Sequence, residues 1–195
     1  HIGGLKILER EGIFPDIIAG TSMGALIGAL YASGMDAGQI EELASSMDWK
    51  RVALLIDPTL PKTGLIEGRR IEELLKSTIG DVEFADLKMP FACVATDIKS
   101  GEEIVIKRGS VLEGVRASIS LPAIFTPVKR EGRFLVDGGL VDPVPVDVLR
   151  EMGADFTIAV NVTPDVWERT HPSLKESHEG NVPNIFKVII QTVYI

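Results

Sequence analysis

The pentapeptide Gly20-Thr21-Ser22-Met23-Gly24 holds a serine with a glycine two positions away on either side. The apolar run 17–19 precedes it and the apolar run 25–32 follows, so this part of the chain is predicted to be strand, sharp turn and helix. In such a nucleophile elbow the serine keeps a strained backbone conformation that projects its hydroxyl. A side chain on either flanking glycine is expected to collide with the neighbouring strand or helix. Ser22 is therefore a candidate nucleophile.

The chemistry around Ser22 requires two further groups. Because Ser22 precedes the first turn of the predicted helix, the backbone amide of Met23 is expected to stabilise a developing oxyanion. A serine hydroxyl is a poor nucleophile unless a base takes its proton. Asp137 ends the apolar run 134–136 as Ser22 ends 17–19, and the carboxyl ends of parallel strands meet at one edge of a sheet, so Asp137 is the candidate base. Asp-Gly is also a common turn, and the pattern leaves that alternative open. Three other carboxylates are expected to cap turns or lie on the surface, namely Asp97, Asp142 and Asp147.

The rest of the chain predicts an alternation of helices and short strands. Helical patterns cover the start of the chain and the ranges 25–32, 36–47, 69–79, 110–118 and 146–152. Short apolar runs predict strands at 17–19, 91–96, 134–136 and 156–162, and Ser100-Gly101 joins the second of these to 104–106 as a hairpin. Apolar strands between helices favour an α/β fold whose mostly parallel sheet is covered on both faces. We interpret residues 1–195 as one domain of this kind.

Composition limits the classes of function. The chain has 195 residues and a net charge of −8, so it lacks the basic surface expected of a nucleic-acid partner. No run reaches the roughly 20 apolar residues of a membrane-spanning helix. Cys93 is expected to be a buried, inert thiol, and a chain with one cysteine suits a reducing compartment, which predicts a cytoplasmic protein. The range 49–58 combines a tryptophan, two cations and apolar residues, and is interpreted either as a segment over the core or as a lid in peripheral contact with a membrane surface.

Three stretches together resemble the patatin-like phospholipases, closest to the bacterial members. They are the pentapeptide at 20–24, the stretch from Arg116-Ala117-Ser118 through Pro122 to Phe125 and Pro127, and Asp137-Gly138-Gly139-Leu140 followed by Pro143-Val144-Pro145-Val146. The resemblance implies a three-layer α/β/α sandwich and hydrolysis of the acyl esters of glycerolipids and lysolipids. It also implies a Ser-Asp dyad without histidine, in which Ser22 is the nucleophile and Asp137 the base, and it implies no metal and no cofactor.

The substrate pocket and the complete oxyanion hole are less defined by the sequence. The apolar stretch 121–128 is too often interrupted by proline for a regular element and suits a pocket wall, with Leu121, Pro122, Ile124 and Phe125 as candidates. The glycine-rich oxyanion loop implied by the resemblance would precede His1. We therefore expect the remaining oxyanion donors upstream of His1, in a domain that lacks this loop and its C-terminal end.

Two alternative functions stay open. An ordinary α/β-hydrolase would supply its nucleophile, acid and histidine in the order Ser22, Asp137 and His171. A lipid-binding or regulatory module could keep the same fold without turnover. The sequence does not indicate head group, acyl length, positional preference or oligomeric state.

Overall fold

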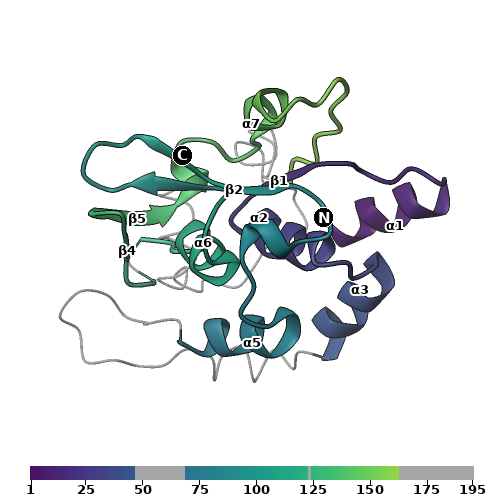
Figure 1. The fold of residues 1–195 in the computed structure, drawn as a ribbon, viewed down its shortest axis with the longest axis horizontal. Coiled ribbons are helices and arrows are strands. Elements are labelled where there is room, and N and C mark those ends of the chain that lie inside the picture. Colours follow the sequence, from purple (N-terminus) through teal and green to yellow (C-terminus); the bar gives the residue numbers. More distant parts are fainter. Residues whose placement is uncertain (47–68, 123, 163–195) are drawn as a thin grey trace, which may run out of the picture.

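The structure is a computed structural model that describes residues 1–46, 69–122 and 124–162 (Figure 1). Its helices are α1 (Ile2–Arg10), α2 (Met23–Ala32), α3 (Ala37–Ser46), α5 (Arg69–Ile79), α6 (Val111–Ser118) and α7 (Val146–Glu151), with the short 3₁₀ helices η1 (Phe84–Asp86) and η2 (Gly138–Leu140). Its strands are β1 (Ile18–Thr21), β2 (Phe91–Asp97), β3 (Glu103–Ile106), β4 (Val128–Arg130) and β5 (Arg133–Asp137). The predicted segment 49–58 and His171 lie outside the described residues.

Strand β2 is the centre of the sheet because it pairs on both of its edges. Cys93 lies opposite Gly20 of β1 and also opposite Ile106 of β3, so β1 and β3 lie on different edges. Ala95 lies opposite Ile104 of β3 and also opposite Asp137 of β5. Strands β1 and β5 therefore share one edge of β2 and meet there end to end, and β4 continues the sheet beyond β5.

The α/β class is confirmed, but the strand directions differ from the expected mostly parallel sheet. Among the described strands, β1 and β2 are parallel, whereas β2 pairs antiparallel with both β3 and β5, and β4 pairs antiparallel with β5. The reason is that an apolar run reports burial on both faces of a sheet and carries no information on direction. Every residue of β2 is buried, as the run predicted.

Helices cover both faces of β2, which gives the three predicted layers (Figure 1). Residues of a strand point alternately to the two faces. Ala92 and Val94 pack with Val148 of α7 on one face. On the other face, Cys93 and its odd-numbered neighbours on β2 pack against α2 and α6. Cys93 is fully buried as predicted, and burial raises the pKa of its thiol well above the ordinary range.

Helix α2 lies within this core because it is apolar on every side. Ala25, Ala29 and Ala32 face the sheet and α6, and their small side chains allow a close approach. The larger Ile27 and Leu30 face the opposite way and pack with Ile2 and Leu5 of α1 and Ile40 of α3. The helix that carries the elbow serine at its start is thus fixed on two sides.

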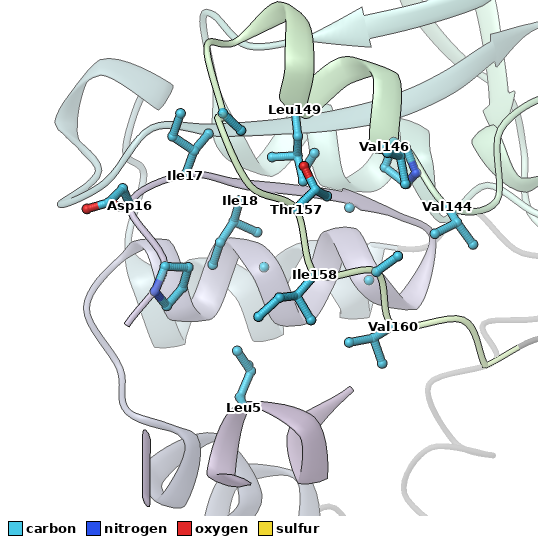
Figure 2. A pocket seen from close by; sticks show the side chains of 18 of the residues that line it. Leu5, Asp16, Ile17, Ile18, Val144, Val146, Leu149, Thr157, Ile158 and Val160 are labelled. Carbon is cyan, nitrogen blue, oxygen red and sulfur yellow. The ribbon is translucent and has the colours of Figure 1, made fainter. Parts of the chain in front are cut away.

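The expected strand at 156–162 is absent, which is a correction to the sequence-based assignment. These residues are irregular, with Phe156 83% exposed and Val162 59% exposed. The segment runs across from β1, but a cavity of about 510 Å³ lies between them (Figure 2). An apolar run forms a strand only where it exchanges backbone hydrogen bonds with a neighbouring strand, and none of the five described strands forms a ladder with this segment.

Candidate active site

Ser22 occupies a strained turn between β1 and α2. Its backbone has φ 54° and ψ −118°, in the region that residues other than glycine rarely adopt. A Cβ atom on Gly20 would lie 2.3 Å from the carbonyl oxygen of Gly24, so the strand and the helix can cross this closely only with glycine at position 20. The expected collision at the second glycine is wrong, because a Cβ atom on Gly24 would meet only the imidazole of His1, at 3.7 Å.

The hydroxyl of Ser22 donates a hydrogen bond of 2.6 Å to Oδ2 of Asp137. Asp137 is fully buried, and its other oxygen accepts a 2.8 Å hydrogen bond from the backbone N–H of Gly139. Burial raises the pKa of Asp137, and the hydrogen bonds from Ser22 and Gly139 lower it by less. A carboxylate with a raised pKa is a stronger base than an exposed aspartate, as proton abstraction from a serine requires.

The strands bring Ser22 and Asp137 together in a different way from the one the sequence suggested. The expectation was that both residues end parallel strands at one edge of the sheet. Instead, β1 and β5 approach each other from opposite directions along β2, with Thr21 opposite Val94 and Asp137 opposite Ala95. The two residues face each other at the junction of the two strands. Gly138 makes this junction tight, because a Cβ atom there would lie 2.2 Å from the carbonyl oxygen of Val94.

Backbone hydrogen bonds fix both members of the pair. The N–H of Asp137 donates to the carbonyl oxygen of Ser120 at 2.9 Å, and its carbonyl oxygen accepts from Oγ1 of Thr96 at 2.9 Å. The N–H of Ser22 donates to Oγ of Ser118 at 3.0 Å. Neither Thr96 nor Ser118 is marked as a site residue by its sequence pattern. Both residues carry a short hydroxyl side chain in a buried segment, and such a hydroxyl must find a hydrogen-bond partner inside the protein.

The remaining candidate residues occupy the surroundings of this pair. Met23 is the first residue of α2, where a backbone N–H has no partner within the helix, and its side chain is 56% exposed. Its role as an oxyanion donor stays a prediction. Asp97 accepts a hydrogen bond from the N–H of Lys99 and pairs with Arg133 at 3.1 Å, while Asp142 caps the N–H of Val144. These contacts agree with the structural roles expected for the two carboxylates.

The predicted pocket stretch begins next to Asp137, because it follows Ser120. Ile124 is buried, and the ring of Phe125 lies under the guanidinium of Arg116, with 5.2 Å between the ring centre and Cζ. The cavity of Figure 2 is a different space, lined by side chains such as Leu5, Ile18, Leu149, Ile158 and Val160 behind β1. Neither Ser22 nor Asp137 lines it, and the substrate pocket at 121–125 stays a prediction.

Metal and membrane features can be stated only for residues 1–46, 69–122 and 124–162. In these ranges, no three side chains of the kinds that bind metals gather closely enough to hold an ion. No helix of the same ranges has both the length and the apolar character needed to cross a membrane.

The layered α/β fold agrees with the comparisons with known proteins. The family model of the patatin-like phospholipases matches residues 1–150, and the chain therefore belongs to this family. An NTE family protein of Mycobacterium tuberculosis is 34% identical to the chain over 165 residues. The lysophospholipase nte1 of Aspergillus fumigatus is 36% identical over 179 residues.

The chain spans less than half the length of these two relatives. The alignments cover 83% and 86% of the chain, but only 45% of the mycobacterial protein and 12% of the fungal one. Among solved structures, VipD of Legionella pneumophila has a TM-score of 0.61 with 14% identity, covering 72% of the chain and 43% of VipD. At this identity the likeness concerns the fold alone.

Proposed function

We propose that this chain is a serine lipid acyl hydrolase of the phospholipase A or lysophospholipase type, acting through a Ser22–Asp137 dyad. The observation that carries the proposal is the 2.6 Å hydrogen bond from the Ser22 hydroxyl to a buried carboxylate whose pKa is raised. Membership of the patatin-like phospholipase family and a relative named as a lysophospholipase support lipid esters as the substrate class.

The proposed reaction has two halves. Ser22 Oγ attacks the acyl carbonyl carbon, its proton passes to Asp137 Oδ2, and the carbonyl oxygen becomes an oxyanion beside the N–H of Met23. Collapse of this intermediate expels the lipid alcohol, which takes the proton from Asp137, and leaves an acyl ester on Ser22. Water then transfers a proton to Asp137, attacks the ester and releases the fatty acid, while Ser22 regains its proton.

The geometry favours a dyad over a triad. In a Ser-His-Asp triad the carboxylate contacts the imidazole, and the imidazole contacts the serine. Here the serine donates directly to the carboxylate at 2.6 Å, which leaves no space for a ring between the two oxygens. The second carboxylate oxygen accepts a hydrogen bond from the N–H of Gly139. This arrangement supports Asp137 as the general base itself.

Exposed apolar side chains next to both members of the dyad support an acyl chain as the group that binds. Met23 follows Ser22 directly and is 56% exposed, and Leu140 and Val141 follow the Asp137 turn and are 40% and 38% exposed. Exposed apolar residues beside a polar site suit a substrate with a long hydrocarbon part. The same side chains would let the protein approach a membrane surface peripherally during turnover.

The test is hydrolysis of p-nitrophenyl butyrate and of lysophosphatidylcholine by the purified full-length protein and its Ser22→Ala variant. The proposal expects turnover of both esters and its loss in the variant, because only the attacking hydroxyl is removed. Ser33→Ala is the matched control, since Ser33 lies just past the other end of α2 and its hydroxyl donates to the carbonyl oxygen of Leu30 in that helix. A Ser22→Ala protein that keeps the wild-type rate would overturn the proposal.

A further inference from the structure

The strained conformation of Ser22 needs an anchor. A non-glycine residue at positive φ costs on the order of 1–3 kcal/mol and persists only where its surroundings hold it. The carbonyl oxygen of Ser22 is held by the first turn of α2, where it accepts from the N–H groups of Ala25 and Leu26. Its N–H points the other way, out of the helix and toward α6.

The anchor on that side is the hydroxyl of Ser118, the last residue of α6. This oxygen accepts the hydrogen bond from the N–H of Ser22 at 3.0 Å and donates its own proton to the carbonyl oxygen of Val94 at 2.6 Å. Ser118 has no exposed surface, so water cannot replace either bond. One hydroxyl thereby ties the elbow to the central strand β2.

The same Val94 carbonyl is also the contact point for the base. Gly138, directly after Asp137, packs against this oxygen so closely that a Cβ atom would lie 2.2 Å from it. The nucleophile and the base are therefore both located relative to one peptide group of β2. Through Ser118, the distance from Ser22 Oγ to Asp137 Oδ2 is set by the rigid sheet and not by the turn alone.

We propose that Ser118 is a positioning residue for the nucleophile: its hydroxyl, bridging the Ser22 N–H and the Val94 carbonyl, aims Ser22 Oγ at Asp137. The inference rests on the proposed function, because it assigns Ser118 a task in that reaction. Ser118 acts through Ser22 and does not touch the substrate.

Ser118→Ala removes the bridging oxygen and keeps the shape of the side chain. Displacement of a reacting group by about 1 Å costs on the order of 10²-fold in rate, so we expect kcat on p-nitrophenyl butyrate to fall by about that factor. KM should stay within about threefold of wild type, because ground-state binding is untouched. The kcat of Ser118→Cys should lie between those of wild type and Ser118→Ala, since a thiol is a weak hydrogen-bond partner. Labelling of Ser22 by a fluorophosphonate should slow in parallel with kcat.

Ser110→Ala is the matched control on the same helix. Ser110 caps the N-terminus of α6 by accepting from the N–H of Glu113 at 3.3 Å, and its loss weakens the helix without reaching the dyad. The proposal expects this variant to lose thermal stability and keep kcat. Equal losses of kcat in Ser110→Ala and Ser118→Ala would mean that any loosening of α6 matters, and would overturn the proposal.

Three further outcomes would overturn it: a folded Ser118→Ala protein with wild-type kcat, a raised KM at constant kcat, or failure of both Ser118 variants to fold while Ser110→Ala folds. Hydrogen exchange at the Ser22 amide separates this inference from the proposed function. If Ser22→Ala kept the wild-type rate, the proposed function would fail. Faster exchange at that amide in Ser118→Ala would still show that Ser118 holds it, and unchanged exchange would refute the contact.

Discussion

Replacing Asp137 by asparagine should inactivate the protein and stabilise it at the same time. Asparagine has nearly the same shape, and its amide can keep both contacts: the oxygen can accept from the N–H of Gly139, and the NH₂ group can donate to Oγ of Ser22. What the substitution removes is a buried negative charge. None of the ion pairs among the described residues includes Asp137, so no cation compensates for this charge.

The direction of the stability change follows from the raised pKa of Asp137. Because burial raises the folded-state pKa above the ordinary value of about 3.9, the folded protein binds this proton more tightly than the unfolded chain does. The folded state therefore loses stability as pH rises through the interval between these two pKa values. For every tenfold difference between the acid dissociation constants of Asp137 in the folded and unfolded states, the free energy of unfolding changes by about 1.4 kcal/mol. A change of that size corresponds to roughly 3 to 6 °C in Tm at this chain length.

The assay is thermal unfolding of both proteins from pH 3.5 to pH 8, with ester hydrolysis measured in parallel. We expect Asp137→Asn to have the higher Tm at pH 8, with the gain shrinking to nothing as pH falls below the ordinary aspartate range. Its kcat should be lower by about 10²- to 10⁴-fold, as for the loss of a general base. An inactive variant that is less stable than wild type at pH 8 would refute the reasoning, because the buried carboxylate would then be favourable.

Three more predictions test separate parts of the account. In wild type, kcat/KM should fall as the pH is lowered, because protonated Asp137 cannot accept the serine proton. The pH of half-maximal kcat/KM should lie above the ordinary aspartate pKa, and a value at or below about 4 would contradict this. Gly138→Ala should lower both Tm and kcat, since its Cβ would lie 2.2 Å from the Val94 carbonyl oxygen. The control Gly3→Ala, whose Cβ would have no atom within 4 Å, should raise the free energy of unfolding by about 0.5–1 kcal/mol in chemical denaturation. Equal effects of the two substitutions on stability would contradict the packing argument. Simultaneous replacement of all histidines should leave a substantial esterase rate, and a loss of several powers of ten would favour a triad; these residues are His1, His171 and His178.

The elements that the sequence predicted well are those encoded locally. The Gly20 to Gly24 pentapeptide predicted the strand, turn and helix. The helix predicted from residue 36 is also present, and it is capped locally: the N–H of Gln39 donates to the Asp36 carboxylate at 2.8 Å, and the N–H of Asp36 donates to the Gln39 side chain at 3.0 Å. Such signals depend on backbone conformation within a few residues. Ser22 and Asp137 were both found because each interrupts an apolar run with a polar residue followed closely by glycine.

The direction of each strand and the strand that it pairs with could not be predicted from such local signals. The apolar run at 134–136 predicted the burial of Leu135 and Val136, but Phe134 is 38% exposed. Nothing in the run shows that β5 pairs antiparallel with β2 and ends against the end of β1. The run at 156–162 has strand-like composition, yet it forms no strand and lies across a cavity from β1. The anchoring role of Ser118 depends on three segments far apart in the sequence, so no local pattern reports it.

The central claim, that Ser22 is a nucleophile activated by Asp137, is tested most directly by covalent labelling. The purified chain is treated with a fluorophosphonate, and the modified residue is located by peptide mass spectrometry. The account predicts one adduct, on Ser22, that is absent in Ser22→Ala and forms at least about 10² times more slowly in Asp137→Asn. An adduct on another residue, or a labelling rate that Asp137→Asn leaves unchanged, would contradict it.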